Sequence, residues 1–186
     1  MENKFDFSPK DLTDGREPLE WKTKYPFGAW ILIICESLYI SLLLFGVPIV
    51  IFLIWLKIPH SFFSSVSEEA YKILAKYVYA WLGAFYGGII IDLKWLYHSV
   101  SKKKWHVDRI LWRILEPHLS ASLGLIFMFL LTSGLLNIFD QDYLNLPAVA
   151  ISIGILVGLF SDNATGKLAE IASKLFGASK DDCPRD

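Results

Sequence analysis

Hydrophobic and polar positions are segregated into long blocks along this chain. Four apolar runs that carry few charges are separated by polar segments. A transmembrane helix needs about 20 predominantly apolar residues to cross the hydrocarbon core of a bilayer. We therefore predict an all-α membrane protein with four transmembrane helices, at about residues 28–56, 70–98, 118–139 and 146–161. The last of these runs is short, and it spans the bilayer only if the helix extends at an end or the bilayer thins.

Two other segments have the periodicity of amphipathic helices. In the sequence SKKKWHVDRILWRILEP, apolar residues recur at helical spacing beside basic residues and tryptophans, and Pro117 suggests a turn before the third span. Residues 163–176 show a similar apolar stripe. We predict interfacial helices at about 101–116 and 163–176, which would form a collar on the inner face of the membrane.

The distribution of Lys and Arg predicts the orientation. The N-terminal segment 1–27 carries five of them, the loop after the first span carries Lys57 alone, and the loop after the second span carries five. The segment 137–145 carries none, and the chain from residue 162 to the end of the polar tail 177–186 carries four. This pattern predicts a multi-pass protein of the cell's inner (plasma) membrane with both termini in the cytoplasm.

Composition narrows the classes of function. The 186 residues are 54% hydrophobic and have a net charge of −1, so no overall positive field favours nucleic acid. The two cysteines form no zinc or disulfide pattern, and the spacing of His98, His106, Asp108 and His118 matches no zinc signature. Nucleophile-elbow, P-loop and HExxH patterns are absent from the sequence. We therefore expect a protein that is not an enzyme and has no metal or cofactor.

Small residues predict the surfaces through which the helices pack. Helices in lipid associate where small side chains allow their backbones to approach closely. Intrachain packing and association with other copies are both open for any one stripe, and the number of stripes favours a homo-oligomer. The packing residues that we predict are Gly83, Gly87, Gly88, Gly154 and Gly158.

Charged residues within the spans are candidates for function, because a charge in the hydrocarbon region is costly. Glu36 lies inside the first span, and Asp92 and Lys94 lie near the cytoplasmic end of the second. Glu36 could pair with Lys94, or it could be protonated and hydrogen-bonded within the bundle. The third alternative is a polar pathway for cations or protons, lined by Glu36 and Asp92.

The basic loop is a candidate contact for anions. Lys102, Arg109 and Arg113 share one helical face, and two arginines one turn apart repel each other unless anions lie nearby. Lipid phosphate, a nucleotide or a carboxylate of a cytoplasmic protein could supply the negative charge. We also expect Asp162, at the start of the second amphipathic segment, to contact Arg109 or Arg113.

Two patterns carry a resemblance. KWLYHSV…W..DR.LWR…P..S begins at Lys94, and G..VGLFSDNATGKLAEIA..LFG begins at Gly154. Together they resemble a group of small bacterial four-helix membrane proteins that has no established activity. The architecture is also similar to that of membrane effectors of anti-phage systems.

Two functions follow as hypotheses. The first is an oligomeric membrane protein that forms or gates a pore, as a bacterial defence effector would. The alternative is a scaffold or accessory subunit that recruits a cytoplasmic partner.

Overall fold

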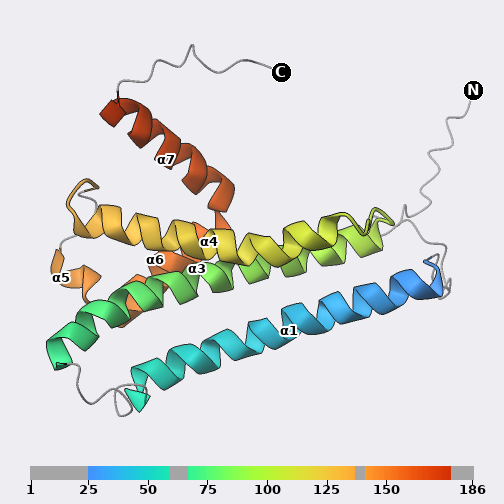
Figure 1. Ribbon diagram of the computed structural model, residues 1–186, viewed down its shortest axis with the longest axis horizontal. Helices are drawn as coiled ribbons and strands as arrows, with labels where there is room; N and C mark the ends of the chain where they lie inside the picture. The colour runs from blue at the N-terminus through green and yellow to red at the C-terminus, as the bar shows by residue number, and fades with distance from the viewer. Residues whose placement is uncertain (1–24, 59–66, 137–140, 177–186) are drawn as a thin grey trace, which may run out of the picture.

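The computed structural model describes residues 25–58, 67–136 and 141–176, and all regular structure in these ranges is helical (Figure 1). The predicted segments 1–24 and 177–186 lie outside the described residues. The helices are α1 (Phe27–Trp55), α3 (Glu68–Ser101), α4 (Arg109–Thr132), α5 (Gln141–Leu144), α6 (Pro147–Leu159) and α7 (Ser161–Phe176).

Three helices, α1, α3 and α4, are long and apolar enough to cross a membrane. The prediction of an all-helical fold is therefore confirmed for the described residues, and three of the four predicted spans are candidate membrane spans by length and composition. The predicted fourth span differs from the other three. Helix α6 has 13 residues, which rise about 20 Å and fall short of a hydrocarbon core of about 30 Å. It qualifies as a span only together with Ala164–Ile171 of α7, from which it is bent by 98°.

The basic loop is organised differently from the prediction. No separate helix occupies 101–116, because α3 continues to Ser101 and α4 begins at Arg109 and passes through Pro117. Proline lacks the N–H that would bond to the carbonyl four residues earlier, but membrane helices tolerate this when neighbouring helices pack around the site. Pro117 is buried against Gly88 of α3, and so it lies within a helix rather than at a turn.

The end of α3 is set by a Schellman motif. The amide of Lys104 donates to the carbonyl of Ser99, and the amide of Lys103 donates to the carbonyl of Val100. Lys103 takes the left-handed conformation (φ 58°) that glycine usually adopts at this position. The motif reverses the chain and delivers it to α4, so the loop is a compact connection.

Helix α3 is the centre of the bundle, and α4 and α6 pack along it. Gly154 and Gly158 of α6 contact the backbone of Ala80 and Ala84 of α3 so closely that a Cβ at either glycine would overlap a carbonyl oxygen. Gly83 and Gly87 of α3 lie in the same contact, against the α6 backbone. All five predicted packing glycines therefore have neighbours within the chain, and they give no argument for association with other copies.

Helix α1 lies alongside α3 (Figure 1). Its buried residues are Ile33, Glu36, Ile40 and Val47, which follow one helical face. The other faces expose large apolar side chains such as Phe45, which is 71% exposed. Such surfaces suit lipid, so α1 is a peripheral helix of the bundle.

We expect Gly158→Val to destabilise the fold, because the added methyl groups would separate α6 from α3. Overpacking of this kind costs about 1–3 kcal/mol or more. Thermal unfolding in mild detergent, followed by circular dichroism, measures the change.

The matched control is Gly46→Val in α1, where a Cβ meets no neighbour within 4 Å. Equal losses of stability in the two variants would contradict the close contact between α3 and α6.

Candidate functional site: a cavity with buried carboxylates

A cavity of about 500 Å³ opens where α6 ends. Helix α6 stops at Leu159, beside Gly87, whereas α3 continues for another 14 residues to Ser101. Between Gly87 and Ser101, α6 therefore does not cover the groove between α3 and α4. The cavity is lined from α3 by Ile91, Asp92, Trp95 and Ser99, from α4 by Arg109, Trp112, Arg113 and Glu116, and from the α6–α7 junction by Leu159, Phe160 and Ser161.

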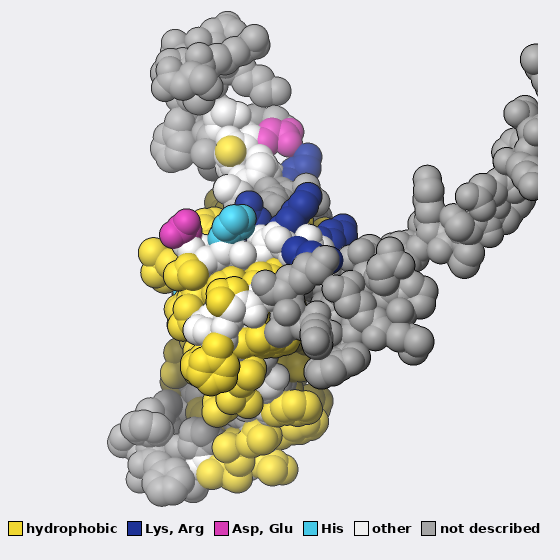
Figure 2. Space-filling view, turned by 90° about the vertical axis from the view of Figure 1, so that its right-hand side faces the viewer, with side chains coloured by type: hydrophobic (Ala, Val, Ile, Leu, Met, Phe, Trp, Pro, Cys, Tyr) yellow, Lys and Arg dark blue, Asp and Glu magenta, His cyan; other side chains and the backbone are white. Residues whose placement is uncertain are grey.

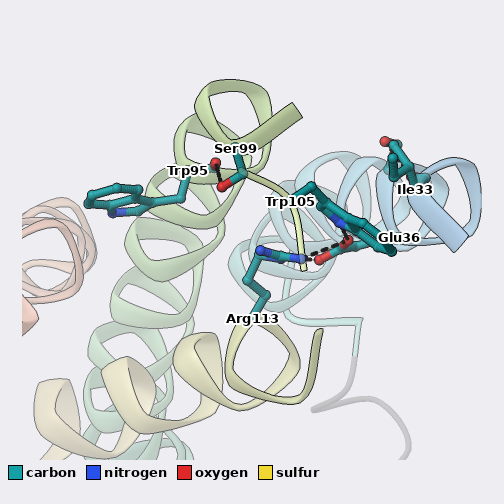
Figure 3. Close-up of polar contacts among 7 residues, drawn as sticks. Ile33, Glu36, Trp95, Ser99, Trp105 and Arg113 are labelled. Carbon is teal, nitrogen blue, oxygen red and sulfur yellow. Dashed lines mark hydrogen bonds and ion pairs between the residues drawn. The ribbon is translucent and has the colours of Figure 1, made fainter. Parts of the chain in front are cut away.

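Glu36 and Arg113 form a buried ion pair next to this cavity (Figure 3). The guanidinium of Arg113 donates through Nε to Oε1 of Glu36 and through Nη2 to Oε2 at 3.1 Å. The indole Nε1 of Trp105 also donates to Oε2, at 3.0 Å. The side chains of Glu36 and Arg113 are only 3% and 5% exposed. Two donors fix the carboxylate in place, and the pair connects α1 to α4.

The connection before α4 completes this arrangement. Trp105 is buried, and its ring meets that of Tyr25 edge to face, with centroids 6.2 Å apart. The backbone amide of Trp105 donates to the Tyr25 hydroxyl at 3.4 Å. The residues just before α1 therefore hold the indole against Glu36.

Asp92 is a second buried carboxylate, and it is 2% exposed. Within the described residues its Oδ2 has no hydrogen-bond partner, although it lies in the wall of the cavity. Glu116, also in the wall, is 6% exposed and accepts a hydrogen bond of 2.9 Å from the hydroxyl of Ser161. The two carboxyl groups thus come from adjacent helices and border the same space.

The charges of this buried cluster do not balance. Among the buried side chains, Glu36, Asp92 and Glu116 supply three carboxyl groups, and Arg113 supplies one guanidinium that is already bound to Glu36. Arg109 also lines the cavity, but its side chain is exposed. An uncompensated buried charge is strongly unfavourable. A proton or a cation in the cavity would remove the imbalance, so binding of a positive charge is the chemistry that this arrangement can perform.

Of the other predicted site residues, Arg109 lines this cavity, whereas Lys94 and Lys102 do not. Lys94 is exposed, and Glu36 pairs with Arg113 in place of the Lys94 considered from the sequence. Lys102 and Arg109 are also exposed and lie at the same end of the bundle. Figure 2 views this end, where Lys and Arg side chains gather above an apolar surface. The side chain of Asp162 lies outside the described residues, and so does its expected contact with the arginines.

Three functional candidates were not identified from the sequence, namely Trp105, Glu116 and Ser161. Glu116 follows Arg113 by three residues, which places the two on one face of a continuous helix. The predicted helix 101–116 contains both residues, but its sequence does not indicate which neighbouring helix this face meets. Within the described residues, no group of three or more His, Cys, Asp and Glu side chains is arranged to hold a metal ion.

No protein-family model, curated protein or solved structure matches this chain. Fold and site together define a class, that of helical proteins with candidate membrane spans and a cavity bordered by buried carboxylates at one end of the bundle.

We expect Glu36→Ala and Arg113→Ala each to destabilise the protein by about 3–5 kcal/mol, because each leaves an unpaired buried charge. The double variant Glu36→Met, Arg113→Met removes both charges and should recover most of this loss. Thermal unfolding of the purified protein in one detergent gives the comparison.

Lys94→Ala is the control, since Lys94 is exposed, and it should change the stability little. A Lys94→Ala variant as unstable as Arg113→Ala would favour the pair considered from the sequence over the observed one.

Proposed function

We propose that this protein is a non-enzymatic membrane protein that passes protons or small cations, forming or gating a pore. The observation that carries this proposal is Asp92 of the candidate span α3, a carboxylate that is 2% exposed, has an unpartnered oxygen in the described structure and borders a cavity. Ionisable residues within a membrane span commonly mark ion or proton pathways.

The cavity would be the inner vestibule of that pathway. Below Asp92, the glycines and alanines of α3 and α6 are in close contact. Passage through one chain would require these two helices to separate. Passage of ions between copies of the chain would require the self-association expected from the sequence. The exposed apolar surface of α1 would be the available interface. Glu36 would connect α1 to α4 and would not line the pore, because its carboxylate is bound by Arg113 and Trp105.

The orientation is part of the proposal. The basic residues of the loop between α3 and α4 favour the cytoplasmic side of a bacterial inner membrane. The vestibule would then open to the cytoplasm, with both termini on that side. A role as an anti-phage effector rests on the resemblance in architecture alone.

A scaffold that recruits a cytoplasmic partner is the second candidate. It is favoured by α7, which extends away from the bundle and would offer a surface beyond the membrane (Figure 1). A partner that co-purifies with the full chain and is lost when residues 161–186 are deleted would support it, provided that vesicles containing the protein are impermeable to ions.

Asp92→Asn tests the pathway. We expect proteoliposomes with the wild-type protein to dissipate a proton or potassium gradient, and the variant to reduce the flux at least about tenfold, as fluorescent pH and potential dyes would report. The substitution preserves the shape of the side chain and removes a buried charge, so the fold should be retained.

Glu69→Gln is the matched control, because Glu69 is exposed at the opposite end of α3. Flux that is absent from the wild type, or equal in Asp92→Asn and wild type, would refute the pathway.

Labelling of Cys183 tests the orientation in a Cys35→Ser background. A membrane-impermeant maleimide should leave Cys183 unlabelled in intact spheroplasts and modify it after permeabilisation. Labelling in intact spheroplasts would reverse the proposed topology.

A further inference from the structure

A second groove, with a volume of about 520 Å³, lies beside the carboxylate cavity and is basic. The two spaces share Arg109 and the apolar side chains of Ile91, Trp95 and Leu159. The ionisable residues of the second groove are Lys94, His98, Lys102, Lys104 and Arg109.

Secondary structure explains how these residues come together. Lys94, His98 and Lys102 follow one another at intervals of four residues along α3 and its C-cap, and therefore share one face. The Schellman motif at Lys103 turns the chain back, so that Lys104 lines the same groove. Arg109, the first residue of α4, completes the set.

The positive charges of this groove have no acidic partners in the described part of the chain. The salt bridges of the described residues all involve basic side chains outside the groove. They join Glu36 to Arg113, Glu68 to Lys57 and Lys72, and Glu170 to Lys167. Lys94, Lys102, Lys104 and Arg109 line one small groove, so their positive charges repel each other. An anion in the groove would replace that repulsion with attraction.

We propose that this groove binds a phosphate group. Three ammonium groups and one guanidinium exceed what a single carboxylate can neutralise, whereas a phosphate presents several oxygens to multiple donors. The apolar wall of Ile91, Trp95 and Leu159 suits the organic part to which the phosphate is attached. That phosphate belongs to an anionic lipid headgroup or to a soluble phosphate compound, and the two have the same chemistry at the groove.

Phosphate binding does not require ion passage, and its test measures binding alone. The probes are phosphatidylglycerol and pyrophosphate. Lipid retention is measured by native mass spectrometry after transfer from mixed phosphatidylglycerol and phosphatidylcholine nanodiscs. Pyrophosphate binding is measured by calorimetry on the full-length protein in phosphatidylcholine nanodiscs.

The groove variant is Lys94→Gln, Lys102→Gln, Lys104→Gln. Its matched control is Lys57→Gln, Lys72→Gln, Lys167→Gln, which removes three exposed lysines outside the groove and gives the same net charge. We expect the groove variant to lose at least about tenfold in binding of one probe or both, while the control stays close to wild type.

The two arms identify the source of the phosphate. Loss of phosphatidylglycerol alone indicates a lipid headgroup, loss of pyrophosphate alone indicates a soluble ligand, and loss of both indicates that the groove accepts either. Equal effects of the two triple variants would reduce the binding to net charge and overturn the site. Absence of binding to wild type in both arms would overturn it as well.

Discussion

The backbone contact between α3 and α6 is the constraint on which the rest of the structure depends. Glycines and alanines on both helices bring their backbones together, and this contact fixes the position of α6 along α3. Because α6 has only 13 residues, its end falls next to Gly87 and leaves the following turns of α3 and α4 uncovered. The cavity beside Asp92 is a consequence of that register.

The buried ion pair has a different part in the molecule. Helix α1 has mostly lipid-facing surfaces and packs along one side of α3, so few contacts determine its position. The bond between Glu36 and Arg113 gives α1 a directional attachment, and Trp105 and Tyr25 support it from the connecting segments. A buried pair of this kind contributes more to specificity of arrangement than to net stability, because burying the two charges offsets much of their attraction.

Opposite charges are sorted into two adjacent spaces at one end of the bundle. The cavity holds Asp92 and Glu116, the neighbouring groove holds the lysines, and Arg109 borders both. An anion in the groove would draw on the same guanidinium that lies near the carboxylates. The proposed phosphate site and the proposed cation pathway are therefore positioned to influence each other through Arg109, although each stands on its own observations.

The sequence by itself determined the class of fold. Long apolar runs predicted candidate spans at α1, α3 and α4, and the small-residue stripes include the glycines that lie between α3 and α6, because composition and helical periodicity are local properties. Only the tertiary structure decided the partner of Glu36, the continuity of α4 through Pro117, and the cavity left by the short α6. These features depend on how the helices are aligned with one another along their axes. The pattern of residues along one helix does not determine that alignment.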